Sequence, residues 1–353
     1  MDRIMDGILR RVTLGPSLVR RIAEVDEFKG RWQALRSLAP ERLTRLQRVA
    51  TVESVASSTR IEGVTLSDDE VHALLRGVAT DRLQTRDEQE VAGYAAVMER
   101  IFDSWRALEL TENHLLQLHQ VLLAHSPTDA AHRGAYKTRP NSIEAVAADG
   151  RSLGVLLTTT APLDTPREMQ ALVDETRAAL LGDEHHPILV IAAFVARFLA
   201  IHPFQDGNGR LSRALTTLLL LRSGYLYVPY ASLERVIEHN KDVYYERLRR
   251  AQTTWGTDQP DLAAWMGFFV DCLIEQKNVL LHRLDREQLL DPMAPLSAAI
   301  LTLALERGRV TVREVVTNQG ANRNTIKLHL KQLVAAGQLV QRGRGRGTWY
   351  ERV

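Results

Sequence analysis

A short segment in the second half of the chain, IHPFQDGNGRLSRAL at residues 201–215, gathers side chains that could act on a phosphate group. Its centre is Gly207-Asn208-Gly209, followed by an apolar run that predicts a helix. At a glycine-lined helix N-terminus the backbone N–H groups point outward, with the positive end of the helix dipole behind them. The segment therefore predicts an anion site, for which phosphate is the natural occupant.

Two arginines and an acid surround this turn. Arg210 and Arg213 lie three residues apart on the predicted helix, so two guanidinium groups can reach successive phosphates of a nucleotide. Asp206 comes directly before the turn, where a carboxylate would repel phosphate unless a divalent cation lies between them. We therefore expect Mg²⁺ to bridge Asp206 and the phosphates.

His202 supplies the remaining chemistry. A neutral imidazole near pH 7 can take a proton from a hydroxyl as it attacks phosphorus, which phosphoryl or nucleotidyl transfer requires. The alternative is a buried structural histidine beside surface arginines. Six compatible residues within nine positions favour the catalytic interpretation.

Helical periodicity dominates the first 290 residues, so a mainly α fold is predicted. The expected helices cover roughly residues 41–60, 68–78, 86–107, 111–124, 166–182, 187–200, 209–223, 240–252 and 260–288. The proline- and glycine-rich segment 134–166 breaks the pattern. Two short extended pieces, 142–146 and 153–157, flank an Asp149-Gly150 turn and predict a β-hairpin flap; a disordered surface loop is the alternative.

The character of the chain changes again after a linker at residues 291–295. A helix, a capping-box helix from Thr311, a third helix and two short strands joined by a basic loop follow, which is the order of a winged helix-turn-helix domain. Residues 315–353 hold seven basic residues and one acid, Glu351. DNA contacts are expected from Arg323, Thr325, Lys327 and Lys331 on the third helix and from the loop at residues 342–346. Protein recognition or dimer formation are the alternatives.

Composition narrows the setting. The 353 residues carry a net charge of +2, which does not by itself predict a polyanionic partner. The single cysteine, Cys272, excludes a disulfide framework or a cysteine-based zinc site within one chain. The N-terminus lacks a signal-peptide pattern, and the apolar run at 187–196 is too short to span a bilayer. We expect a cytoplasmic protein without a membrane partner.

The stretch from His202 to Arg213 resembles the signature of the Fic family (the Fic/Doc superfamily), HPFxxGNGRxxR with an acid before the first glycine, at every defined position. The resemblance implies a helical Fic fold, ATP as co-substrate, Mg²⁺, and transfer of AMP to a Ser, Thr or Tyr hydroxyl of a target protein and of the chain itself. Phosphorylating members of the Doc type carry lysine where Gly209 stands, which favours AMP transfer.

By position, the resemblance assigns a role to each residue of this stretch. His202 would be the general base and Asp206 the Mg²⁺ ligand. Asn208, with the amides of Gly207 and Gly209, would form the hole for the α-phosphate. Arg210 and Arg213 would clamp the phosphates.

Two further segments are similar to parts of that family. Residues 134–143 resemble the flap that holds a target segment by backbone pairing, with Thr138, Asn141, Ser142 and Ile143 as its contacts. Family members often have arginine where Lys137 stands. Residues 240–245 resemble the helix beside adenine, with Tyr244 or Tyr245 near the base; ordinary packing is the alternative.

Ser58-Thr59-Arg60-Ile61-Glu62-Gly63 resembles the family's inhibitory motif, [S/T]xxxE[G/N]. On a helix Ser58 and Glu62 lie one turn apart, and Gly63 is a natural stop. The resemblance implies that this helix, at about 53–63, packs against the nucleotide site. Glu62 would pair with Arg213 and remove the guanidinium that holds the γ-phosphate. Support of AMP removal by Glu62 is left open.

We expect three regions: an N-terminal helical region (1–108), a catalytic core with flap and following helices (109–290), and the winged domain (291–353). One alternative function is a DNA-binding transcription regulator whose Fic core senses a nucleotide. Another is transfer of UMP, phosphate or phosphocholine on the same scaffold. A homo-oligomer is compatible with the sequence.

Overall fold

The computed structural model describes residues 4–35, 40–77, 83–146, 152–255, 257, 260–289, 295–335, 337–343 and 345–352. The chain divides into two compact units, residues 1–280 and 281–353. None of the helices in these ranges is long and apolar enough to cross a membrane.

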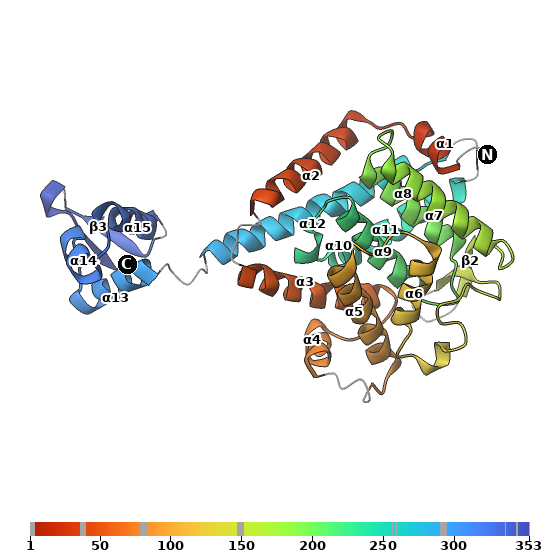
Figure 1. Ribbon diagram of the computed structural model, residues 1–353, viewed down its shortest axis with the longest axis horizontal. Helices are drawn as coiled ribbons and strands as arrows, with labels where there is room; N and C mark the ends of the chain where they lie inside the picture. Colours follow the sequence, from red (N-terminus) through yellow and green to blue (C-terminus); the bar gives the residue numbers. More distant parts are fainter. Residues whose placement is uncertain are drawn as a thin grey trace. The chain divides into compact units, whose positions relative to one another are not determined.

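The first unit is mainly helical, as the periodicity predicted (Figure 1). Its helices are α1 (Ile4–Arg11), α2 (Pro16–Leu35), α3 (Pro40–Ile61), α4 (Asp68–Gly77), α5 (Arg86–Ser104), α6 (Glu112–Leu122), α7 (Thr165–Leu181), α8 (Pro187–Ile201), α9 (Asn208–Arg222), α10 (Leu233–His239), α11 (Lys241–Thr254) and α12 (Ala263–Leu289), the last of which runs into the second unit. Short 3₁₀ turns lie at Pro127–Asp129 and Val228–Tyr230. Helices α1, α2 and α10 were missing from the predicted set.

Helices α8 and α9 form the centre of this unit because both are apolar almost all round. A helix without a polar face has to be buried, and α8 and α9 pack against each other, with α7 along α8 and α5 along α9. Figure 1 shows both inside the unit. The site residues predicted in 202–213 therefore lie at the junction of the two most buried helices.

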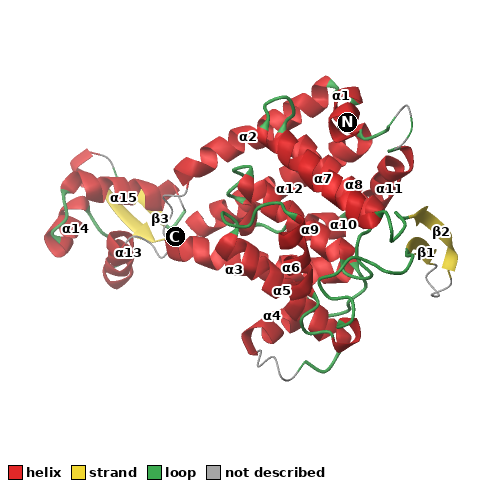
Figure 2. Cartoon of the chain, turned by 45° about the vertical axis from the view of Figure 1, so that its right-hand side comes forward, coloured by secondary structure: helices red, strands yellow, loops and turns green. Residues whose placement is uncertain are grey.

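A single hairpin interrupts the described helices of the first unit. Strand β1 (Ser142–Val146) pairs antiparallel with β2 (Ser152–Thr158), with register shifts after Ile143 and after Ala145. The predicted β-hairpin is confirmed, and Figure 2 shows it at the edge of the helical body. Its predicted Asp149-Gly150 turn lies outside the described residues.

The second unit contains α13 (Pro295–Arg307), α14 (Val312–Gln319), α15 (Arg323–Ala335) and an antiparallel pair, β3 (Leu339–Arg342) and β4 (Trp349–Arg352), around a 3₁₀ turn at Gly345–Gly347. Thr311 and Glu314 form the predicted capping box of α14. A bridge between Val310 and Tyr350 adds the segment before α14 to the edge of the hairpin. Buried side chains from all three helices and both strands form one small core. Most of the predicted linker, residues 291–294, lies outside the described residues.

Two helical glycines give a matched test of packing. A Cβ at Gly93 on α5 would overlap the carbonyl oxygen of Leu122 at the end of α6, whereas a Cβ at the exposed Gly30 on α2 meets nothing within 4 Å. We expect Gly93→Ala to lower the free energy of unfolding by about 1–3 kcal/mol through overpacking. Gly30→Ala should raise it by roughly 0.5–1 kcal/mol, because alanine loses less backbone entropy in a helix. Thermal unfolding of both variants measures the two shifts; an unfolding temperature of Gly93→Ala at or above that of the parent would contradict the close approach of α5 and α6.

Candidate active site

The predicted histidine lies at the turn between the two central helices. His202 follows α8 directly and adopts φ 52° and ψ 61°, and it is the one non-glycine residue with positive φ in the described part of the chain. A left-handed conformation is strained for a residue with a Cβ and is tolerated where the surroundings over-determine it. The strain turns the chain out of α8 into the loop that leads to α9.

Hydrogen bonding fixes which nitrogen of His202 is free. The Nδ1 atom lies 3.3 Å from the carbonyl oxygen of Leu199, so Nδ1 carries the proton and Nε2 keeps its lone pair. Burial, together with the nearby Lys137 ammonium, lowers the pKa of His202 to about 4. The imidazole is therefore neutral at pH 7, as a proton acceptor must be.

Lys137 braces the start of this loop. Its Nζ donates to the carbonyl oxygen of Ile201 (2.9 Å), to Asn141 Oδ1 (2.8 Å) and to Thr159 Oγ1 (2.9 Å), and its backbone N–H donates to the carbonyl of Pro203 (2.8 Å). Burial lowers the pKa of Lys137 to about 8. The lysine thus ties the segment before the flap to the end of α8.

Two asparagines predicted to contact ligands spend their side chains inside the protein. Asn141 Nδ2 donates to the carbonyl oxygens of His202 (3.3 Å) and Phe204 (2.9 Å). Asn208 Oδ1 accepts from the N–H of Phe204 (2.9 Å), and its Nδ2 donates to the carbonyl of the same residue (2.7 Å). The backbone groups of Asn141 and Asn208 carry what remains of their predicted contacts with target and phosphate.

The predicted glycine turn begins α9. Gly207 is the N-cap with φ 80°, and Asn208 is the first residue of the helix. This is the predicted geometry of N–H groups at a helix N-terminus, which favours an anion. Phe204 is fully buried and anchors the loop below the turn.

Four charged side chains form a closed ring beside the turn. Asp206 Oδ2 lies 2.8 Å from Arg210 Nη2 and 3.2 Å from Arg86 Nη2, while Glu90 lies 3.1 Å from Arg210 Nη1 and 2.7 Å from Arg86 Nε. Burial alone would raise the pKa of Asp206, but the Arg210 guanidinium and the Gly207 N–H lower it. Asp206 is therefore ionised at neutral pH, held in place by α5 and α9.

The Asp206 carboxylate fits the requirements of a magnesium ion bound with a nucleotide. Mg²⁺ in such sites is held by one or two carboxylates, by phosphates and by water. The described residues contain no cluster of three or more His, Cys, Asp or Glu that could hold a metal by itself. The Asp206 side chain is about one-third exposed at the anion site, so it can serve as the single protein carboxylate. The neighbouring Arg210 is almost fully buried, and its Nε has no hydrogen-bond partner among the described residues.

The predicted inhibitory contact is present as geometry. Arg213 Nη2 donates to Glu62 Oε1 (2.6 Å) and to the carbonyl oxygen of Ser58 (2.9 Å), and Arg213 Nε donates to Ser58 Oγ (2.9 Å). Helix α3 ends at Ile61, and Gly63 follows with φ 107°. A Cβ at Gly209 would overlap Glu62 Oε1, so the glutamate comes to the first turn of α9 because residue 209 has no side chain.

A second arginine holds α3 in this place. Arg60 forms a bidentate pair with Glu238 on α10 (2.6 and 3.0 Å) and a bond to Asp68 on α4 (3.0 Å). Bidentate guanidinium–carboxylate pairs fix orientation as well as distance. Helix α3 is thus clamped to α10 and α4 on either side of the residue that reaches Arg213.

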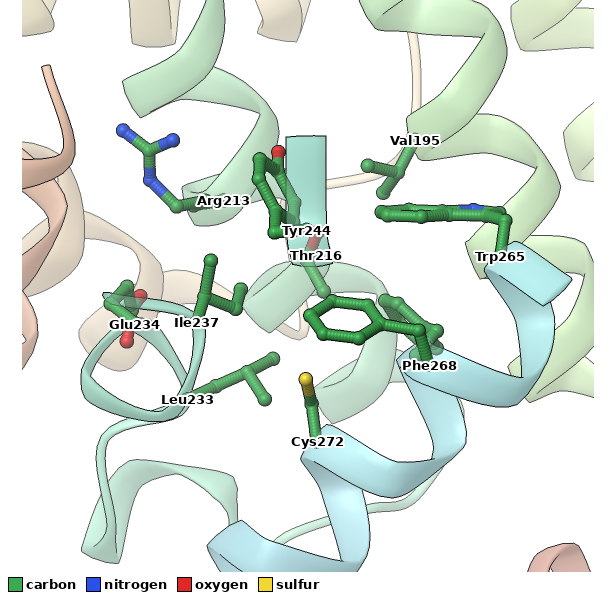
Figure 3. A pocket seen from close by; sticks show the side chains of 11 residues that line it. Val195, Arg213, Thr216, Leu233, Glu234, Ile237, Tyr244, Trp265, Phe268 and Cys272 are labelled. Carbon is green, nitrogen blue, oxygen red and sulfur yellow. The ribbon is translucent and has the colours of Figure 1, made fainter. Parts of the chain in front are cut away.

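The two predicted adenine-side tyrosines have different surroundings. Tyr244 is buried, with its ring 5.7 Å from that of Trp265, whereas Tyr245 is 40% exposed. Tyr244 lines a cavity with Arg213 and aromatic residues of α12, as Figure 3 shows. The cavity measures about 20 Å³, room for roughly one water molecule and too small for a purine. The exposed Tyr245 is the better placed of the two to meet a ligand.

The four residues that were predicted to contact a target lie near one another along the chain. Ser142 and Ile143 are the first two residues of β1, where they face Thr158 and Leu157 in the hairpin register. Thr138 and Asn141 precede the strand, and Thr138 is exposed. The backbone of this segment is therefore next to the loop of His202, through Lys137 and Asn141.

Sequence reasoning missed Arg86, Glu90 and His119, and it did not give Lys137 the role of a loop brace. Arg86 and Glu90 follow the capping box of Thr85 and Glu88, which predicts a helix start and nothing about a partner 120 residues later. A histidine in an apolar helical pattern, as at His119, is usually read as core. The contacts of these residues depend on tertiary structure.

Comparison with known proteins connects this geometry to a family. Residues 109–220 match the Fic/DOC family. A curated relative, the protein adenylyltransferase Fic of Drosophila willistoni, is 27% identical over 255 residues, which cover 72% of this chain and 46% of the relative. The chain spans less than half the length of the first curated relatives that it matches.

Solved structures show the same fold. A Fic family protein from Desulfovibrio desulfuricans G20 is similar with a TM-score of 0.60 and 24% identity over 97% of both chains. A Fic domain containing signaling protein from Bacteroides thetaiotaomicron VPI-5482 gives a TM-score of 0.59 and 24% identity over 72% of this chain and 94% of that one. The segment that carries the histidine, the glycine turn and both arginines is a Fic/DOC family domain.

Proposed function

We propose that the chain is a protein adenylyltransferase that transfers AMP from ATP to a hydroxyl of a target protein and of itself, and that Glu62 restrains it. The observation that carries the proposal is the junction of α8 and α9. There a neutral histidine with a free Nε2 stands four residues before an ionised aspartate, and the aspartate stands beside a glycine-lined helix N-terminus. The curated relatives named protein adenylyltransferase Fic support the same reaction.

In the proposed reaction His202 acts as general base. Its Nε2 takes the proton of the target hydroxyl while the hydroxyl oxygen bonds to the α-phosphorus. The bond from that phosphorus to the bridging oxygen breaks, and pyrophosphate leaves. The N–H groups of the Gly207 turn and the helix dipole of α9 face the charge that develops on the phosphate. The orientation of His202 is maintained by its Nδ1–H bond to Leu199.

Asp206 would hold the Mg²⁺ that accompanies ATP, and Arg210 keeps that carboxylate oriented. When bound, the cation neutralises phosphate charge and orients the leaving group. Arg213 would bind the γ-phosphate. Since Glu62 and Ser58 occupy its guanidinium in this structure, ATP has to replace the Glu62 carboxylate before it can bind productively.

We predict that Glu62→Gly raises AMP incorporation from labelled ATP by about tenfold or more, because a charge-assisted hydrogen bond contributes roughly 1.5–3 kcal/mol. Self-modification or modification of a target provides the readout. Asp69→Ala, which removes an exposed acid from α4, is the charge-matched control and should leave incorporation unchanged. Equal incorporation by parent and Glu62→Gly would refute the inhibitory role.

His202→Ala in the Glu62→Gly background should reduce incorporation by about 10²–10⁴-fold, the usual contribution of a general base. Intact mass spectrometry after incubation with ATP and Mg²⁺ identifies the added group, so it also separates AMP from UMP, phosphate or phosphocholine transfer. Retained activity in the double variant would show that another group takes the proton.

The pKa of His202 sets the expected pH dependence. A base works only when deprotonated, so its contribution is lost as the pH falls through its pKa of about 4. For Glu62→Gly, kcat/KM should therefore stay level from pH 8 to about 6 and fall only below about 5. An acid limb centred near the ordinary histidine pKa of about 6.5 would contradict this environment.

We further propose that the second unit is a winged helix-turn-helix domain that binds DNA. Helices α13, α14 and α15 precede the β3–β4 hairpin in the order typical of that domain. Arg323, Lys327 and Lys331 are exposed on α15, where a recognition helix presents its side chains.

The full chain should shift a labelled DNA duplex at low salt, with a shift that weakens as salt rises. Lys327→Ala with Lys331→Ala should weaken the shift and lower the salt slope by roughly two. Arg20→Ala with Arg76→Ala, two exposed charges in the first unit, is the matched control. No shift at low salt would leave protein recognition as the use of this unit.

A further inference from the structure

His119 is a fully buried histidine on α6 whose two ring nitrogens both bond to backbone groups of other segments. Its Nε2 lies 3.0 Å from the carbonyl oxygen of Asp206, 87 residues later in the chain. Its Nδ1 lies 3.0 Å from the backbone nitrogen of Gly134, at the start of the segment that leads to β1. None of the steps described above uses this residue.

The two partners fix the protonation of the ring. The carbonyl of Asp206 can only accept, so Nε2 carries a hydrogen; the N–H of Gly134 can only donate, so Nδ1 carries none. One side of the ring is thus a donor toward the loop before α9, and the other side is an acceptor toward the flap segment. A phenylalanine could fill the same space but could form neither bond.

The ring also packs along the loop that holds the site. It stacks on Phe204 with centroids 3.8 Å apart and planes 15° apart. A Cβ at Gly207 would lie 3.7 Å from two atoms of the same ring. His119 therefore touches the loop on both sides of Asp206.

The bond to the Asp206 carbonyl has a consequence for the next amide. In a trans peptide the C=O and the following N–H point in opposite directions, and no cis peptide occurs in the described residues. Fixing the carbonyl of Asp206 fixes the direction of the Gly207 N–H. That N–H bonds to the Asp206 carboxylate here and is one of the amides proposed to face the α-phosphate.

We infer that His119 is a positioning residue, whose Nε2–H sets the plane of the Asp206–Gly207 peptide and thereby aims both the metal-binding carboxylate and the anion-binding amide. The inference rests on the proposed function for the identity of the ligands, Mg²⁺ and ATP. His119 itself contacts neither.

The amide side chains separate the two bonds. The terminal amide of glutamine reaches the place of Nε2, so His119→Gln keeps a donor for Asp206 and loses the acceptor for Gly134. The shorter His119→Asn keeps the acceptor near Nδ1 and loses the donor. His119→Phe keeps the stacking on Phe204 and neither bond.

All three variants are made in full-length Glu62→Gly protein. We expect His119→Gln to keep kcat and the apparent KM for Mg²⁺ within a few-fold of that parent. His119→Asn and His119→Phe should lower kcat or raise the KM for Mg²⁺ by about 10–100-fold, as loss of an outer partner of a metal ligand does. Thermal unfolding of the Gln and Asn variants should be similar, since each loses one bond.

Calorimetric titration with ATP and Mg²⁺ gives a readout that does not depend on turnover. Binding by His119→Asn should be weaker than binding by His119→Gln by the same order. If the Glu62→Gly parent binds ATP and Mg²⁺ but transfers no AMP, the proposed function fails and the binding order still decides the role of His119. Equal kcat, KM and binding for the Gln and Asn variants, or losses that follow only the unfolding temperature, would overturn the inference.

Discussion

The site depends on hydrogen bonds that side chains make to the carbonyl groups of the loop between α8 and α9. This loop is buried without belonging to a helix or strand, so its backbone groups need partners from elsewhere. Lys137 binds the carbonyls of Ile201 and Pro203, and Asn141 binds those of His202 and Phe204. His119 binds that of Asp206. The strained conformation of His202 is stable because its neighbours on both sides are held in this way.

The charges around the loop follow from the same constraint. Arg210 is buried with two carboxylates of different origin, Asp206 beside the turn and Glu90 on α5, so removing either would leave an uncompensated cation. Arg213 is equally buried, but its carboxylate, Glu62, comes from the end of α3 and is one-third exposed. One arginine therefore has permanent partners, whereas the other has a partner that a phosphate can replace.

The sequence allowed a good prediction of what is local. The spacing in residues 202–213 predicted a glycine turn at a helix N-terminus, and the hairpin and most helices of the first unit were correctly expected. Helix α2 was missed because its apolar residues face distant partners, as Phe28 does with Tyr227, and give only a weak periodic pattern. The side chains of Asn141 and Asn208 were predicted to meet ligands, but the loop uses both for its own backbone. Such bonds span up to 87 residues of sequence, and no local pattern encodes them.

The N-terminal helices contribute to the site in two opposite ways. Helix α5 supplies Arg86 and Glu90 to the ring that orients Asp206, so it supports the proposed metal ligand. Helix α3 supplies Glu62, which occupies the proposed phosphate arginine, and it is fastened separately through Arg60 to Glu238 and Asp68. Because the Arg60 cluster and the α5 ring share no residue, the end of α3 can be displaced while the ring stays intact. Restraint and catalysis can therefore be separated within one buried centre, which a single shared network would not permit.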